Sequence, residues 1–188
     1  MIVMEETALE NQKADVQLLA QQYCRENELD ITLCFEMPAG WETANGMWEP
    51  QSRTLFFNRS MLEDAPAHEQ LFFLYHELRH AAQHLKPEQF DSKSSKCLAY
   101  VIGYDGECWK RVNGTWQGCR LEGSETFFTQ MYLGQPYEMD ANAFAYQQVK
   151  ALLGDSEALE ELYSFWQPER EIPFEEYEAL YEQIDRQI

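Results

Sequence analysis

The sequence lacks any apolar run long enough to cross a bilayer, and it has no internal repeat, low-complexity tract or signal-peptide pattern. A membrane-spanning helix needs roughly 18 or more consecutive apolar residues. The most apolar stretch, residues 71–75, is far shorter and has charged residues close by. We therefore expect a chain without a membrane span or targeting segment.

Basic residues are scarce as well. The chain has 14 Lys and Arg against 33 Asp and Glu, a net charge of −19. Such a charge repels phosphate groups, which argues against direct binding of nucleic acid. Residues 155–188 alone hold 11 acidic and 2 basic side chains, with apolar residues at helical spacing. We interpret them as a docked helical segment whose acidic outer face is either merely solvated or a docking surface for a basic partner.

Cysteine spacing typical of metal ligands is also missing. The five cysteines form an odd number without any close pair, which is typical of reduced thiols in a cytoplasmic protein. With 188 residues, 45% of them hydrophobic, the chain can bury a full core. We expect one domain, residues 1–188, of the α+β class.

One motif is present that can carry chemistry. Residues 76–80 read H-E-x-x-H, and on a helix His76 and His80 lie on one face about 6 Å apart. Both imidazoles can reach a single Zn²⁺, and Glu77 can reach a water on that metal. Burying three such groups on an apolar helix without a partner costs several kcal/mol, so a structural role alone is the less favoured interpretation.

The motif lies in a predicted helix over residues 66–85. Residues 60–63 have a capping-box pattern, Pro66 suits a first turn, and Pro87 stops the helix. Leucine and alanine recur every three or four residues and form a core face, next to the face that carries the motif. A catalytic zinc needs a third protein ligand. His84 lies a full turn beyond His80 and is poorly placed to supply it.

A better candidate for the third ligand lies in residues 137–146, which read YEMDANAFAY. H-E-x-x-H followed by such a helix resembles the ImmA/IrrE family of metallopeptidases, whose E-x-x-A-[DN] core other gluzincins share. The resemblance covers about residues 54–149 and implies a zincin-like fold. It implies that His76, His80 and Glu138 bind zinc, that Glu77 is the general base, and that Asn142 orients a ligand histidine.

Helical geometry favours Glu138 over Asp140, because Glu138 shares a face with small alanines that allow close packing. Two features depart from the family pattern. Arg79 stands where the family usually has glycine before the second histidine, and 58 residues separate His80 from Glu138, more than the family usually has. The excess, about residues 97–122, predicts an inserted three-stranded β meander. Its D-G and N-G pairs are strong signals for hairpin turns, and Cys108 and Cys119 could face each other across it.

The rest of the chain fits the same architecture. A capping box at Thr7 and apolar residues at helical spacing predict an amphipathic helix that reaches about Asn27. Short strands are expected over residues 31–36, 46–49 and 53–57. In zincins an edge strand beside the active helix binds extended substrate, and residues 53–58 are the candidate for that strand.

These patterns predict a zinc-dependent metalloendopeptidase in which Glu77 activates a water on the metal. The resemblance implies a specific intracellular regulatory protein as substrate, with a basic DNA-binding repressor as the typical target. The alternative is a metal-containing but non-catalytic acidic protein that captures a basic partner, with Arg79 either filling the open coordination position or pairing with Glu77. A weaker option is a structural His/Glu cluster without metal.

Two further functional details follow from the sequence. A hydrogen-bond donor to the oxyanion is required, and Tyr104 and Tyr146 are two candidates among many tyrosines. Trp109 and Trp116 in the meander are candidates for gating the cleft or selecting substrate, although they could equally cover the core.

Overall fold

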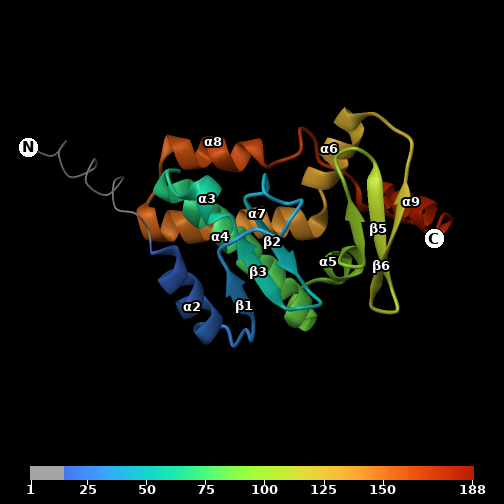
Figure 1. The fold of residues 1–188 in the computed structure, drawn as a ribbon. Coiled ribbons are helices and arrows are strands. Elements are labelled where there is room, and N and C mark those ends of the chain that lie inside the picture. The colour runs from blue at the N-terminus through green and yellow to red at the C-terminus, as the bar shows by residue number, and fades with distance from the viewer. Residues whose placement is uncertain (1–14) are drawn as a thin grey trace, which may run out of the picture. The chain divides into compact units, whose positions relative to one another are not determined.

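The computed structural model describes residues 15–188, in which helices and two small three-stranded sheets form a mixed α+β fold (Figure 1). The chain divides into two compact units. The first contains the described residues up to Leu85 together with Ala141–Phe165, and the second contains Lys86–Asp140 and Trp166–Ile188. The organisation as one domain stays a prediction, while the α+β class is confirmed.

Helix α4 (Ala67–Leu85) is the central element of the first unit and confirms the predicted helix. The amides of Glu69 and Gln70 donate to the Pro66 carbonyl at its start, and a short 3₁₀ turn, η1 (Pro87–Gln89), follows its end. The expected core face is buried, since Leu71, Leu74 and Leu78 are at most 1% exposed.

The capping box expected at residues 60–63 is wrong. Ser60 lies inside a short helix, α3 (Arg59–Leu62), whose cap is Asn58. The Asn58 side-chain oxygen accepts from the Met61 amide at 3.1 Å and from the Ser60 hydroxyl at 2.9 Å. An asparagine two residues earlier therefore occupies the position that the serine was expected to take.

The first sheet contains β1 (Thr32–Cys34), β2 (Gly46–Glu49) and β3 (Thr54–Phe57) in the order β1-β3-β2. Strand β3 pairs in parallel with β1 and antiparallel with β2. The prediction that residues 53–58 form the substrate-binding edge is therefore wrong, because both sides of β3 are already paired. The edge strand that packs against α4 is β2.

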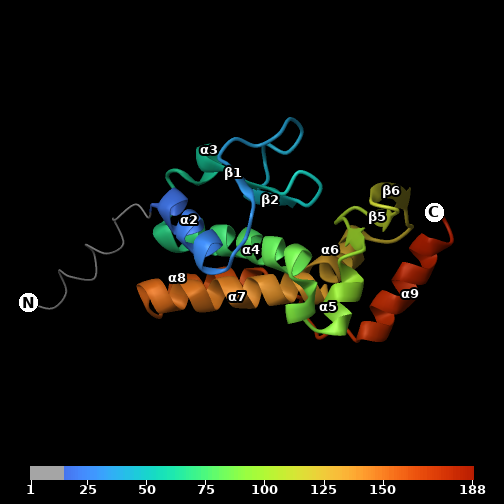
Figure 2. The same ribbon diagram turned by 90° about the horizontal axis from the view of Figure 1, so that it is seen from below.

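Helices cover the other side of α4. Figure 2 shows the sheet on one side of α4, and α7 (Pro136–Leu153) with α8 (Glu157–Phe165) on the other. Helix α2 (Val16–Glu26), capped by the Asp15 side chain, also packs on α4. The capping box expected at Thr7 lies outside the described residues.

The second unit contains the predicted meander, formed by β4 (Tyr100–Ile102), β5 (Glu107–Val112) and β6 (Thr115–Arg120). Both predicted turns are present, with positive φ at Gly106, Asn113 and Gly114. The first strand is shorter than expected, because Cys97 ends a helix, α5 (Ser92–Cys97). The Asp91 carboxylate caps that helix by accepting from the first backbone amides, an effect that the strand pattern did not reveal.

Two helices, α6 (Glu125–Leu133) and α9 (Phe174–Asp185), complete the second unit. The last part of the acidic segment, α9, is a docked helix as expected, since Tyr177, Leu180, Tyr181 and Ile184 are all at most 4% exposed. The first part of that segment is a separate helix, α8, which belongs to the first unit. The Tyr181 ring stacks on Tyr100 at 4.0 Å. In residues 15–188, no helix combines the length and the apolar character that a membrane crossing demands.

Candidate metal centre

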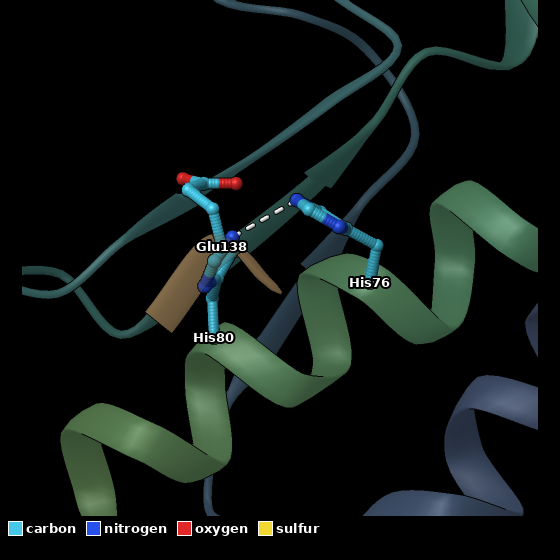
Figure 3. A group of neighbouring side chains, drawn as sticks. All are labelled: His76, His80 and Glu138. Carbon is cyan, nitrogen blue, oxygen red and sulfur yellow. Dashed lines mark hydrogen bonds between the residues drawn. The ribbon is translucent and has the colours of Figure 1, made fainter. Parts of the chain in front are cut away.

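The two histidines of the H-E-x-x-H motif face each other on α4 (Figure 3). Their Nε2 atoms are 2.9 Å apart, and their ring planes stand at 89° to one another. His80 is buried and His76 is half-buried. The four-residue spacing on a straight helix thus directs both nitrogens to one point, as the sequence predicted.

A buried glutamine sets the orientation of His80. Its Nδ1 lies 2.8 Å from the side-chain oxygen of Gln83, which is completely buried. Because an amide oxygen only accepts, the proton of a neutral His80 ring stays on Nδ1 and the Nε2 lone pair remains available. Sequence reasoning missed Gln83, although its place three residues after His80 was a signal.

Glu138 joins these histidines from the first turn of α7. It is only 6% exposed, and the side-chain donor atoms of His76, His80 and Glu138 all lie within 4.8 Å of one another. The three residues therefore form a group that could hold a metal ion. Within residues 15–188 no other cluster of histidine, cysteine or acidic side chains meets this condition.

The two rejected ligand candidates lie outside this group, as expected. Asp140 is half-buried on α7 and does not belong to it. His84 contacts neighbouring groups instead. Its Nδ1 is 3.1 Å from the His80 carbonyl oxygen, and its ring is 6.4 Å from the Trp48 ring of β2.

Asn142 lies one turn after Glu138 and is only 2% exposed. Ala141 and Ala145 are also buried on this side of α7, as the pattern of small residues predicted. The role of Asn142 in orienting a ligand histidine stays a prediction. The contact to the ring nitrogen of His80 comes from Gln83.

Glu77 is 8% exposed and lies directly beneath the edge strand β2. A Cβ atom placed on Gly46 would be 2.7 Å from the Glu77 Cγ and 3.1 Å from the Phe56 carbonyl oxygen. Such distances are far below van der Waals contact. Position 46 therefore requires glycine so that the strand can approach this carboxylate, a constraint that the sequence alone did not reveal.

Arg79 has aromatic neighbours. Its guanidinium carbon lies 4.7 Å from the centre of the Phe144 ring on α7, a cation–π contact. Burial raises the pKa of Tyr23 on α2, and the nearby positive charge of Arg79 opposes that rise. The arginine that departs from the family pattern thus takes part in the packing of α4 against α2 and α7.

The two tyrosine candidates for an oxyanion donor differ in their surroundings. The Tyr146 hydroxyl donates to Glu160 of α8, and its ring stacks on Tyr163 at 4.6 Å. Tyr104 lies in the turn between β4 and β5, is 40% exposed, and packs its ring 4.2 Å from Tyr132. Burial raises the pKa of Tyr104 to about 12, which a side-chain interaction with Tyr132 opposes and the Glu138 charge reinforces.

The two tryptophans of the meander are half-buried. A Cβ atom on Gly118 would lie 3.0 Å from the Trp109 indole nitrogen, so this indole packs against Gly118 of the neighbouring strand β6. Trp116 is opposite Arg111 on the neighbouring strand. A role in gating or selecting substrate stays a prediction.

No protein-family model, curated protein or solved structure matches this chain.

Proposed function

We propose that this protein is a zinc-dependent metallopeptidase with a zincin-like active site. The observation that carries the proposal is the convergence of His76, His80 and Glu138, with Glu77 next to the first histidine and buried under β2. Packing alone does not require two imidazoles and one carboxylate from two helices to converge. It also does not require a further buried carboxylate, that of Glu77, in the same motif.

The donor set fits zinc. Two histidine nitrogens and a glutamate oxygen are a common set at catalytic zinc sites, whereas Ca²⁺ and Mg²⁺ prefer oxygen ligands alone. The Gln83 contact to His80 is also the kind of outer hydrogen bond that fixes a ligand histidine. When bound, zinc supplies Lewis acidity that activates water and polarises a peptide carbonyl.

Glu77 carries the proton chemistry in this proposal. Its carboxylate accepts a proton from the attacking water. It then transfers that proton to the nitrogen of the departing amine as the peptide bond breaks, and Glu77 ends as a carboxylate again. Gly46 lets the backbone of β2 approach this carboxylate. The base is thereby kept in a narrow, buried position beside the metal ligands.

The edge strand β2 is the element that we propose binds the substrate backbone. It pairs with β3 on one side only, and it packs on the helix that carries the motif. An extended peptide can add to such an edge through main-chain hydrogen bonds. Cleavage of an extended segment in a protein substrate follows from this arrangement.

The substrate that we propose is a specific regulatory protein, with a basic DNA-binding repressor as the first candidate. Support comes from the resemblance of the two motifs to ImmA/IrrE metallopeptidases and from the net charge of −19. An acidic protein attracts a basic partner over a distance, and salt weakens this attraction.

The test compares wild type with Glu77→Gln on a basic repressor protein, with and without a chelator. We expect Glu77→Gln to keep zinc and the fold while the cleavage rate falls on the order of 1000-fold. His68→Asn changes another histidine of α4 and should leave cleavage unchanged.

The alternative functions give other results. A non-catalytic protein that captures a basic partner would bind the repressor equally well as wild type and as Glu77→Gln, without any cleavage. A purely structural His/Glu cluster would bind no zinc, and its stability would not respond to the chelator.

A further inference from the structure

We propose that Cys108 and Cys119 form a reversible disulfide bond across the meander, made by exchange with a small disulfide such as oxidised glutathione. The bond braces β5 against β6. The proposed peptidase chemistry uses neither thiol, because both residues lie in the second unit and neither belongs to the metal group.

The two cysteines lie directly opposite each other on neighbouring antiparallel strands. Cys108 of β5 pairs with Cys119 of β6 in the register of the hairpin, so both side chains project from the same face of the sheet. That face is the buried one, since Cys108 belongs to the core of the second unit and Cys119 packs against it. The register thus confirms that these residues face each other across the meander.

The spacing of this pair suits a bond that forms and breaks. The Leu121 amide donates to the Gly106 carbonyl at 2.9 Å, so the Cys108–Cys119 pair, two positions further along, is also a hydrogen-bonded pair of the ladder. Cα atoms of such a pair are about 5.5 Å apart, within the range of roughly 4.4–6.8 Å for disulfides. Their Cβ atoms are up to about 5.5 Å apart, whereas a disulfide needs about 3.5–4.5 Å. The strands must therefore draw together, and a strained disulfide is easily reduced.

The two thiols differ in accessibility. Cys108 is completely buried, and its thiol donates to the Gly106 carbonyl at 3.6 Å, whereas Cys119 is half-buried. Burial raises the pKa of Cys108 to about 12, and the neighbouring Cys119 adds to this rise. Burial raises the pKa of Cys119 as well. Cys119 is therefore the thiol that a dissolved disulfide reaches first.

The reaction consists of two thiol–disulfide exchanges. The Cys119 thiolate attacks one sulfur of oxidised glutathione, which forms a mixed disulfide and releases one glutathione thiolate. The Cys108 thiolate then attacks the Cys119 sulfur and releases the second glutathione thiolate. The two cysteines are oxidised by two electrons in total, the small disulfide is reduced to two thiols, and the cysteine protons end on the released glutathione.

The remaining cysteines do not offer an equivalent pair. Cys97 lies in α5 and Cys24 in α2, while Cys34 is opposite Phe56 in the first sheet. Among residues 15–188, no other two cysteines occupy paired positions of a sheet. Cross-linking is therefore expected to be specific to the meander.

The test treats the full chain with oxidised glutathione at about pH 9, where more of each thiol is ionised. Remaining thiols are alkylated, and the chain is digested with trypsin and a glutamate-specific protease, which cleave after Lys110 and Glu107. Cys97, Cys108 and Cys119 then end on separate peptides. We expect mass spectrometry to find the Cys108 peptide joined to the Cys119 peptide, and dithiothreitol to separate them.

Variants separate this bond from general oxidation. In Cys119→Ser, Cys108 should stay reduced, and Cys108→Ala should stop at a mixed disulfide between Cys119 and glutathione. Cys34→Ser, in the first unit, should still form the bond. A wild type in which Cys119 ends as the glutathione adduct, or in which Cys108 is joined to Cys97, would overturn the proposal. So would Cys108 and Cys119 that both remain reduced.

Urea unfolding tests the bracing of the hairpin. We expect the midpoint of oxidised wild type to lie about 0.5 M above that of the reduced protein, because a cross-link restricts the unfolded chain. Oxidised Cys119→Ser should show no such rise. An equal midpoint in both forms of the wild type would overturn the bracing role. Neither result bears on zinc content, so the disulfide and the metal centre succeed or fail separately.

Discussion

The polar cluster of α4 and the tyrosine-rich core of the second unit bury polar atoms in different ways. On α4, Glu77, His80 and Gln83 are each at most 8% exposed, and the Gln83 side chain contacts His80, one of the two facing histidines. In the second unit, Tyr100 and Tyr177 fill the core with their rings, and their hydroxyls donate to the Asp185 carboxylate and to the Met131 carbonyl. The first arrangement is costly for a fold, whereas the second stabilises it.

This difference separates residues that hold the fold from residues that we propose bind the metal or act in catalysis. Substitutions in the tyrosine-rich core should change the free energy of unfolding without changing the affinity for zinc. Substitutions around the polar cluster should change zinc affinity or turnover while the fold remains.

The largest effect is expected for Ile184→Ala in α9. Ile184 is completely buried in the core of the second unit, so truncation leaves a cavity. We expect the free energy of unfolding in urea to fall by about 3 kcal/mol. Leu152→Ala, at a position that is 49% exposed, should change it by less than about 0.5 kcal/mol. A large loss of zinc affinity in folded Ile184→Ala would break the separation between the two regions.

The next effect concerns the position of Glu77. Gly46→Ala introduces a methyl group 2.7 Å from the Glu77 Cγ, so the carboxylate or the strand must move. We expect turnover to fall about 100-fold, because misplacement by about 1 Å has that effect on a positioned group. Zinc content should stay the same. Met47→Ala, at the next residue of β2, serves as the control and should keep most of the activity.

Gln83 tests the orientation of the ligand histidine. Gln83→Leu removes the acceptor of the His80 Nδ1 proton, and we expect zinc affinity, measured by competition with a chelator, to fall about 10- to 100-fold. Gln83→Glu keeps an acceptor and should retain most of the affinity. Gln70→Leu replaces another buried glutamine of α4, one that bonds to the Ala65 carbonyl, and should leave zinc affinity unchanged.

The smallest effect is a dependence of stability on alkaline pH. Burial raises the pKa of Tyr177 and of Tyr181 above the value of about 10 in an unfolded chain. The folded state thus retains protons that the unfolded state releases. The resulting stability is complete below about pH 10 and is lost as the pH rises further. Urea unfolding should show this decline, and Tyr181→Phe should reduce it. A free energy of unfolding that stays constant up to about pH 11 would contradict this account.

Local patterns predicted α4 and the meander well. The spacing of Leu71, Leu74 and Leu78 and the D-G and N-G turns depend on neighbouring residues only, and the structure confirms them. The geometry of His76 and His80 follows from the same helical spacing. Glu138 came from a motif resemblance, because 58 residues separate it from His80 and no local pattern links them.

Other features depend on contacts between distant segments. Strand β1 pairs with β3 in parallel, and this pairing makes β2 the edge in place of residues 53–58. The requirement for glycine at position 46 arises only when β2 lies over Glu77. Asn58, which caps α3 in place of Ser60, also donates from its side-chain nitrogen to the carbonyls of Glu42 and Ala44. None of these contacts leaves a periodic signal in the sequence.

The metal content of the chain tests the central claim most directly. The protein should be purified without a metal-affinity tag, and its zinc measured by mass spectrometry of the element. We expect stoichiometric zinc in wild type and in His68→Asn, and almost none in a variant with both His76→Ala and His80→Ala that remains folded by circular dichroism. Little zinc in the wild type, or a zinc content that the double substitution does not change, would contradict a metal centre at His76, His80 and Glu138.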